Sequence, residues 1–334
     1  MDLISIVIPC YNEAKVLPYL FRSLSTLIDE IQVEANVELI LVDDGSRDDT
    51  WDAIAAFAKL DSRVRAFRLS RNFGHQAAIT CGYEEALGDA VICMDADLQD
   101  PPDVVHAMIS KWREGADIVL GKRIGREGES GFKIFSAYIF YRLIRRLSEV
   151  DLPEDVGDFR LLSRRSVNAF NKLGERRRYL RGMVAWLGFQ TEVVEYVRKP
   201  RTAGEPKYSL AKSIALALDG LVSFSLAPLR LSFFLAIAAS TPFLIYFSYS
   251  LINHIFFHGT VEKGWMSIML AITLFGTVNL FCLGIIGEYI GRIYYEAKSR
   301  PIYLLAERMD SADLSSVHVR STVSASGSAS EENK

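Results

Sequence analysis

Short apolar runs alternate with helical patterns along the N-terminal part of the chain. The runs lie at residues 4–8, 37–42, 64–69, 90–94 and 118–120 and are typical of strands buried on both faces of a sheet. Between them, apolar residues return at the three- and four-residue spacing of helices that cover such a sheet. Every run ends in polar residues. The pattern predicts an α/β domain with a mostly parallel sheet and a ligand cleft along the edge where its strands end.

An acidic turn, Asp95-Ala96-Asp97-Leu98-Gln99, follows the fourth run directly. Asp95 and Asp97 would point to the same side of an extended segment, because side chains alternate along it. Two such carboxylates can face one divalent cation and a diphosphate. The alternative is a plain strand-to-helix turn, with Asp100 near an N-cap and two prolines opening the next helix. The spacing alone leaves both interpretations open.

The pattern changes beyond the fifth run. Residues 131–148 combine an apolar stripe with basic residues, which is typical of a membrane-surface helix; a core helix with a solvated basic face is the alternative. Strands are expected near residues 158–162 and 188–197, with a helix at 167–173 between them. Residues 209–228 trace a second amphipathic helix. A small α+β portion is therefore expected between two surface helices.

Two uncharged stretches, residues 231–252 and 265–287, each have the length of a segment that crosses a hydrocarbon core. Pro242 would kink the first, which a transmembrane helix tolerates. Lys263 is the only lysine or arginine in the connector, whereas basic residues gather before and after the pair. By the positive-inside rule, we expect a two-helix transmembrane hairpin within residues 229–290 of a multi-pass plasma-membrane protein.

Composition restricts the remaining possibilities. A formal net charge of -3 over 334 residues gives no general attraction to nucleic acid, which is not expected as a partner. The four cysteines lack metal or redox spacing and indicate a reducing compartment. The first residues show no signal peptide, so the N-terminus is expected in the cytoplasm. The positive-inside pattern indicates the same side for both ends of the hairpin, so the N-terminal domain and both termini are expected there. Residues 291–310 would form a cytosolic segment, and the serine-rich residues 311–334 a disordered tail.

Five motifs follow one another in an order that resembles a known family. They are Pro9-Cys10-Tyr11-Asn12-Glu13, Val42-Asp43-Asp44-Gly45-Ser46, Asp95-Ala96-Asp97-Leu98-Gln99, Asp158-Phe159-Arg160 and Gly204-Glu205-Pro206-Lys207-Tyr208. Together they resemble the polyprenyl-phosphate glycosyltransferases of glycosyltransferase family 2, which include bactoprenol glucosyltransferases and dolichyl-phosphate mannose synthases. The resemblance extends from residue 4 to about residue 300 and implies a GT-A (Rossmann-like) nucleotide-sugar domain at residues 1–208.

In such a domain the donor nucleotide sugar is held at the strand ends. A tyrosine ring suits a base, and carboxylates suit ribose hydroxyls or a base N–H. The resemblance implies that Arg71 contacts the donor; the alternative is a solvated arginine on the surface. Asp97 and Gln99 match the family's metal ligands, with Asp95 bridging the metal or the ribose, which implies Mg²⁺ or Mn²⁺ as cofactor. The residues implied in donor binding are Pro9, Tyr11, Asn12, Glu13, Asp43, Asp44, Arg71 and Asp95.

Asp158 matches the position proposed in the family as catalytic base. A phosphomonoester has a second pKa of about 6 and is largely anionic at neutral pH, so this carboxylate could orient the acceptor instead. A third possibility is a structural pair with Arg160. Candidates for the lipid phosphate are Arg123, Arg201 and Lys207, because guanidinium and ammonium groups suit a dianionic head group. The basic run at 176–178 and Arg181 could attract anionic lipid or close a loop over the site, and a solvated basic turn is the alternative.

The resulting hypothesis is an inverting transferase that moves one hexose, glucose from UDP-glucose, onto undecaprenyl phosphate at the cytosolic membrane face. The same reaction with GDP-mannose, UDP-GlcNAc or a modified arabinose donor is the alternative. The chain lacks the Gln-x-x-Arg-Trp sequence of processive synthases, which favours single-sugar transfer. A catalytically silent nucleotide-sugar-binding scaffold is the hypothesis from another class. Gly276, Gly284 and Gly287 would allow close helix contacts in a homo-oligomer.

Overall fold

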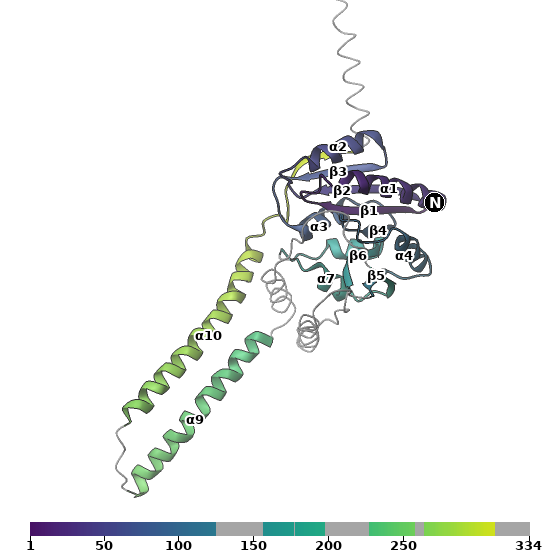
Figure 1. The fold of residues 1–334 in the computed structure, drawn as a ribbon. Coiled ribbons are helices and arrows are strands. Elements are labelled where there is room, and N and C mark those ends of the chain that lie inside the picture. The colour runs from purple at the N-terminus through teal and green to yellow at the C-terminus, as the bar shows by residue number, and fades with distance from the viewer. Residues whose placement is uncertain (125–155, 177, 198–226, 258–263, 311–334) are drawn as a thin grey trace, which may run out of the picture. The chain divides into compact units, whose positions relative to one another are not determined.

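The computed structural model describes residues 1–124, 156–176, 178–197, 227–257 and 264–310 (Figure 1). They belong to two units: the first combines the N-terminal part of the chain with the segment from Pro301 on, and the second contains two long helices. Several predictions fall outside the described residues. These are the surface helix at 131–148, all but the end of the one at 209–228, Arg201, Lys207 and the tail at 311–334.

The first unit is built on an eight-stranded mixed sheet with the strand order β7-β5-β6-β4-β1-β2-β3-β8. Parallel pairs join β1 to β2 and β4, β2 to β3, and β5 to β7. The predicted runs thus form the strands of this sheet. Their bounds are β1 (Leu3–Cys10), β2 (Asn36–Asp43), β3 (Val64–Leu69), β4 (Ala90–Cys93), β5 (Ile118–Arg123), β6 (Val156–Ser163), β7 (Thr191–Tyr196) and β8 (Leu305–Met309).

Most strand pairs are parallel, as predicted, but β6 and β8 are antiparallel to their neighbours and make the sheet a mixed one. β6 lies antiparallel between β4 and β5, with Arg160 opposite Cys93 and Val156 opposite Lys122. Because its direction is reversed, β6 begins at the edge where β4 and β5 end. Asp158, near the start of β6, therefore reaches the same edge as the acidic turn after β4.

Helices cover both faces of the sheet. The bounds are α1 (Leu17–Ile31), α2 (Thr50–Leu60), α3 (His75–Glu85), α4 (Asp103–Arg113), α6 (Arg164–Asn171) and α7 (Leu180–Trp186). Apolar residues of α1, α2 and α4 share one core with the alternate β1 residues Ile4, Ile6 and Ile8. On the other face α3 packs on β1 and β2, and the ring of Tyr83 meets that of Phe170 of α6 edge to face at 5.4 Å. Successive side chains of each strand point to opposite faces of the sheet, so each central strand contributes to both layers.

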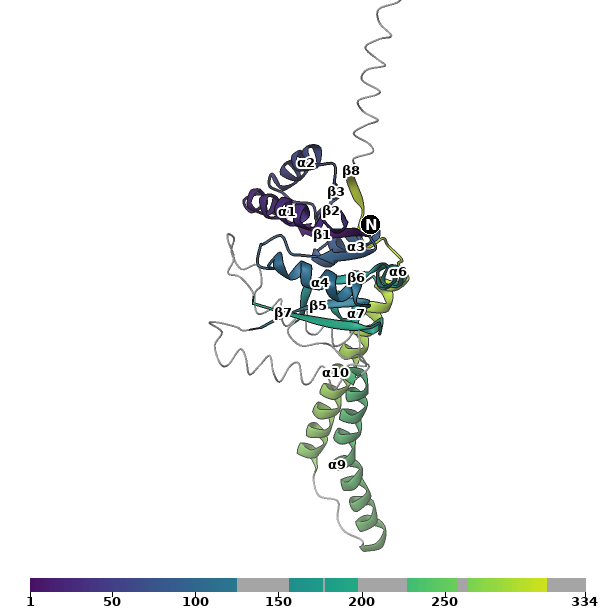
Figure 2. The same cartoon turned by 90° about the vertical axis from the view of Figure 1, so that its right-hand side faces the viewer.

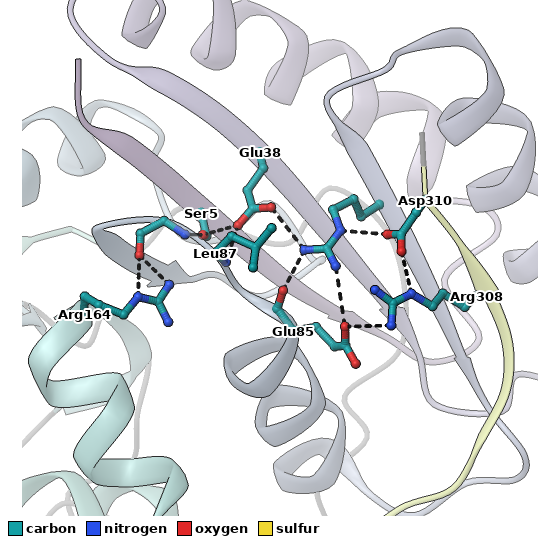
Figure 3. Close-up of polar contacts among 9 residues, drawn as sticks. Ser5, Glu38, Glu85, Leu87, Arg164, Arg308 and Asp310 are labelled. Atoms are coloured by element: carbon teal, nitrogen blue, oxygen red, sulfur yellow. Dashed lines mark hydrogen bonds and ion pairs between the residues drawn. The ribbon is translucent and has the colours of Figure 1, made fainter. Parts of the chain in front are cut away.

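β8 is the edge strand of the sheet and lies beside β3, although the two strands are far apart in the sequence (Figure 2). Ala66 pairs with Met309 and Phe67 with Arg308 in antiparallel register. Figure 3 shows Glu38, Glu85, Arg308 and Asp310, which belong to the polar network that anchors this segment. Arg65, in the same network, contacts Asp310 at 2.7 Å and Glu38 at 3.2 Å. Residues 291–310 were expected to be a simple cytosolic segment. The structure adds a strand there, which alternation could not reveal because it is short and its side chains are largely exposed.

The second unit contains α9 (Ala227–Phe257) and α10 (Trp265–Ala297). The Cys282 thiol contacts the Ser232 carbonyl at 3.6 Å, and the rings of Phe243 and Phe275 lie 5.2 Å apart. Because later residues of α9 meet earlier residues of α10, the two helices are antiparallel. Among the described residues, one helix is long and apolar enough to cross a membrane, at Ile268–Ala297 with a mean hydropathy of 2.2; the apolar part of α9, Ser232–Tyr246, is shorter.

Gly45 makes a close approach between two loops of the first unit, and its replacement should be costly. Its φ is +63°, and a Cβ at this position would lie 2.3 Å from the Arg71 carbonyl carbon. Gly45→Ala should lower the free energy of unfolding by about 2 kcal/mol or more, from left-handed strain and the backbone clash together. Gly174→Ala, in open space, should change it by less than about 0.5 kcal/mol. Urea unfolding followed by circular dichroism measures both, and equal effects would contradict the clash.

Candidate active site

The loops after β1 and β2 are bound to each other by backbone and side-chain hydrogen bonds. The Asn12 N–H donates to the Ser46 hydroxyl at 2.9 Å, and the Arg47 N–H donates to the Asn12 side-chain oxygen at 2.9 Å. The Glu13 N–H donates to the Thr50 hydroxyl, also at 2.9 Å. Asn12 has a φ of 52°, a conformation that asparagine tolerates better than most residues. Two motifs predicted to hold the donor therefore form one continuous structure, in which Tyr11 is partly exposed.

Asp43 and Asp44 are buried beneath these loops. Asp44 accepts hydrogen bonds from the N–H groups of Phe73 at 2.7 Å and Gly74 at 2.9 Å, and burial raises its pKa to about 6 against their opposing effect. Asp43 accepts from the Ser46 N–H at 3.2 Å and contacts Arg68 at 3.5 Å, while burial raises its pKa. Both carboxylates thus shape the loops of the site. Their predicted contact with the nucleoside stays a prediction.

Arg71 is exposed in the loop after β3. Its guanidinium carbon lies 4.0 Å from the centre of the Phe73 ring, and its Nη1 donates to the Asn72 carbonyl at 3.0 Å. The same loop is held to the motif at residues 42–46, because the Phe73 N–H donates to Asp44. Arg71 is thus at the correct edge of the sheet for the predicted donor contact, which stays a prediction.

The acidic turn after β4 presents two carboxylates. Asp95 and Asp97 are partly exposed, whereas Gln99 is buried and donates its N–H to the Asp97 carboxylate at 3.2 Å. Leu98 has a φ of 58°, an uncommon conformation for a branched residue and one that is found at functional sites. Pro102, not Asp100, is the N-cap of α4. The turn is therefore more than a helix start.

The acidic turn suits a divalent cation whose coordination is completed by a substrate diphosphate. Within the parts of the chain that the structure describes, no three His, Cys, Asp or Glu side chains converge on a metal site. Mg²⁺ is commonly held by one or two protein carboxylates together with substrate phosphates. Asp95 and Asp97, both partly exposed, offer that donor set. The residues present thus suit a cation that arrives with a diphosphate.

Asp158 is buried and surrounded by cationic side chains. Arg160 contacts it at 2.5 Å, Arg181 at 3.3 Å and the His75 Nε2 at 3.6 Å. Burial by itself raises the pKa of Asp158, but Arg181, His75 and Arg160 outweigh burial and hold this pKa well below its usual range. The carboxylate is therefore ionised at neutral pH and has a weak affinity for a proton. This environment suits a positioning group better than a general base.

His75 is a functional candidate that the sequence analysis missed, and the contact of Arg181 with Asp158 is a second feature that it did not predict. His75 is the first residue of α3, and its Nε2 lies 3.6 Å from both Asp95 and Asp158. Burial lowers the pKa of His75, yet the two carboxylates leave it above its ordinary value. His75 thus lies between Asp95 of the acidic turn and Asp158 of β6. A histidine at the start of a helix that follows a strand end was the only sequence signal.

The predicted basic run lies apart from Asp158, with the exception of Arg181. Arg178 donates to the carbonyls of Leu173 at 2.9 Å and Glu175 at 3.2 Å. Its Nη1 is buried without a hydrogen-bond partner. Arg178 therefore stabilises the turn after α6, and the predicted attraction of anionic lipid stays a prediction. Residue 177 lies outside the described residues.

Arg123 ends β5 in a polar chain that leads back to the acidic turn. Its Nε donates to the Tyr196 hydroxyl at 3.2 Å, and this hydroxyl donates to Asp100 at 2.8 Å. The second oxygen of Asp100 accepts the Asp95 N–H at 3.4 Å. Burial and the nearby Asp95 raise the pKa of Asp100 to about 6. Arg123 therefore braces the turn through Tyr196, and its predicted role with a lipid phosphate stays a prediction.

Comparison with known proteins gives the family. The model for glycosyl transferase family 2 matches residues 5–170. An uncharacterized glycosyltransferase of Bacillus subtilis, YkcC, is 43% identical over 90% of this chain and 92% of its own length. The bactoprenol glucosyl transferase of Shigella phage SfX is 40% identical over 91% of this chain and 99% of its own length. The chain belongs to glycosyltransferase family 2.

The family assignment confirms the resemblance seen in the motifs, and the chain is a transferase with a GT-A, Rossmann-like α/β fold. A crystal structure of glucosyl-3-phosphoglycerate synthase from Mycobacterium tuberculosis, with Mn²⁺, UDP-glucose and phosphoglyceric acid, is 20% identical with a TM-score of 0.42. It covers 65% of this chain and 76% of that one. The four family motifs within the described residues lie at the edge where β1, β2 and β4 end and β6 begins, which is the edge predicted for the ligand cleft.

Proposed function

We propose that this glycosyltransferase moves a single glucose from UDP-glucose onto a polyprenyl phosphate at the cytosolic face of the plasma membrane. The observation that carries the proposal is the meeting of the acidic turn with Asp158, joined by His75. Such a turn suits a sugar diphosphate, and the cations around Asp158 suit an anionic acceptor. The relatives named bactoprenol glucosyl transferase, similar over nearly their whole length, support glucose and a prenyl phosphate.

The donor half of the site is assigned to the loops after β1, β2, β3 and β4. Tyr11 would face the base, Glu13 and the buried Asp43–Asp44 pair would fix the ribose end, and Arg71 would reach the phosphates. Pro9 and Asn12 set the path of the first loop. Asp95, Asp97 and Gln99 would hold Mg²⁺ or Mn²⁺, which neutralises the charge that develops on the leaving diphosphate.

The acceptor half needs little acid–base help. A phosphate oxygen of the acceptor attacks the anomeric carbon, and the bond from that carbon to the UDP oxygen breaks as the new bond forms. One displacement of this kind inverts the anomeric centre. The acceptor phosphate is already largely anionic at neutral pH, so Asp158 orients the reactants and removes no proton. Arg123, Arg201 and Lys207 stay proposed as lipid-phosphate residues.

Purified protein, a divalent cation, undecaprenyl phosphate and a panel of labelled sugar nucleotides test the function. UDP-glucose should give a lipid-linked glucose with inverted configuration. If GDP-mannose, UDP-GlcNAc or a modified arabinose donor gives the product and UDP-glucose does not, the proposed sugar is wrong but the proposed reaction is supported. Nucleotide binding without any product would support the silent scaffold and refute the enzyme.

The sheet topology supports a hairpin of two membrane crossings. β8 is part of the same sheet as β1 to β7, so the chain lies on one side of the membrane both before α9 and after α10. Residues 298–304 join α10 to β8, and even fully extended they reach only about 25 Å, less than the roughly 30 Å of a hydrocarbon core. If α10 crosses the membrane, an even number of crossings is required. We therefore propose that α9 crosses as well, and that both ends are cytoplasmic.

Labelling with a membrane-impermeant thiol reagent tests this topology. A cysteine in place of Glu262, in the connector, should be labelled in intact cells, because the connector would face the outside. A cysteine in place of Ser311 should be labelled only after the membrane is permeabilised. Labelling of both positions in intact cells, or of neither, would contradict a double crossing.

A further inference from the structure

Two guanidinium groups face the single carboxylate of Asp158, and they differ in exposure. Arg160 is 1% exposed, contacts Asp158 at 2.5 Å and also donates to the Gly157 carbonyl at 3.2 Å. The side chain of Arg181 is 35% exposed, and its Nε and Nη2 lie 3.4 and 3.3 Å from the two carboxylate oxygens. Arg160 is thus the buried counter-ion. Arg181 adds a second positive charge to a carboxylate that is already paired.

The position of Arg181 is set by buried neighbours. The Leu180 N–H donates to the Gln76 side chain at 2.9 Å, and the Leu180 carbonyl accepts from Arg160 at 3.4 Å. Leu180 and Met183 of α7 are themselves buried. α7 is therefore fixed beside the first turn of α3, and the guanidinium of Arg181 is held next to His75 and Asp158. A partly exposed group in a fixed position is suited to bind a ligand.

We propose that Arg181 binds the phosphate of the acceptor and that Asp158 acts by holding this guanidinium in place. The inference rests on the proposed function and deepens it. An anionic phosphate that approached Asp158 alone would be repelled. With Arg160 and Arg181 present, two positive charges face the one carboxylate of Asp158, and a guanidinium has five N–H donors, so Arg181 can contact phosphate oxygens while it stays paired with Asp158.

Binding measured without donor separates this inference from the reaction. Farnesyl phosphate, a short prenyl phosphate, serves as the probe, with inorganic phosphate in a second arm. Arg181→Gln should weaken farnesyl phosphate binding by about tenfold to a hundredfold, and Arg181→Lys should weaken it less, because the charge is kept and the fork is lost. Binding of UDP-glucose should stay within about twofold of wild type. Arg165→Gln is the matched control, since Arg165 is an exposed arginine paired with Asp117 at 3.4 Å.

The outcomes distinguish the possible roles. Competition by inorganic phosphate in the wild type but not in Arg181→Gln would show that the phosphate group alone is recognised; competition by farnesyl phosphate only would show that the prenyl chain is needed as well. Unchanged farnesyl phosphate binding in Arg181→Gln would overturn the inference. So would an equal loss of UDP-glucose binding, which would mark a structural ion pair. If the wild type binds farnesyl phosphate through Arg181 but makes no product with any donor, the proposed function fails and this inference stands.

Discussion

Asp97→Asn should lower the rate of glucose transfer by about 10²- to 10³-fold across the neutral pH range. Asp97 is partly exposed at the acidic turn and accepts the Gln99 N–H at 3.2 Å. An amide is a weaker ligand for a hard cation than a carboxylate, so the cation that neutralises the leaving diphosphate would be held less tightly. A loss of about 3 to 4 kcal/mol of transition-state stabilisation corresponds to this decrease in rate.

The metal concentration provides the control for Asp97. Excess Mg²⁺ or Mn²⁺ should restore part of the activity of Asp97→Asn, because weaker binding is overcome by mass action. Asp103→Asn is the matched variant: Asp103 is an exposed carboxylate in the first turn of α4. It should keep the activity and the metal requirement of the wild type. An Asp97→Asn enzyme whose metal dependence equals that of wild type would remove Asp97 from the metal site.

Asp158→Asn should also lower the transfer rate by about 10²-fold or more, and the loss should be nearly independent of pH. Arg181, His75 and Arg160 hold the pKa of Asp158 well below its usual range, against the effect of burial. The carboxylate therefore stays ionised from about pH 6 to about pH 9, and its charge does not change with the second ionisation of the acceptor near pH 6. A positioning role predicts a constant ratio of the two rates over this range.

A general base predicts a different profile. If Asp158 is a general base, the decrease in rate caused by Asp158→Asn should become smaller as the pH rises, because no proton has to be removed from a fully ionised acceptor. Asp158→Asn also leaves the buried Arg160 without its counter-ion, so UDP-glucose binding should be measured to show that the protein is folded. If the rate of Asp158→Asn approaches that of wild type only at high pH, Asp158 acts as a general base. Wild-type rates at every pH would leave Asp158 with the structural role alone.

The position of many residues proposed for donor binding could be predicted from local sequence. Apolar runs that stop at Asp43 and at Asp95 mark strand ends, and parallel strands bring such ends to one edge without any knowledge of strand order. Burial of Asp44 could not be inferred in this way, because its partners Phe73 and Gly74 belong to the next loop.

The acceptor side depends on contacts between distant segments. β6 enters between β4 and β5 in reverse, which brings Asp158 to the edge of the acidic turn. Arg181 looked like part of a surface basic run, because its spacing from Asp158 carries no local signal. His75 meets carboxylates of β4 and β6 that lie well beyond it in sequence. Such sites are formed by tertiary packing, and periodicity describes only single elements.

The position of β8 sets the order in which the catalytic domain can be completed during synthesis. β3 emerges from the ribosome early, but the strand that pairs with it follows α9 and α10. Until then the edge of β3 has unpaired N–H and C=O groups, which can pair with another chain. At roughly 5 to 20 residues per second, the interval between the two strands lasts on the order of ten seconds or more. The long helices, which are proposed to enter the membrane, are therefore synthesised before β8 can pair with β3, and a fragment cut before α9 would leave the β3 edge unpaired.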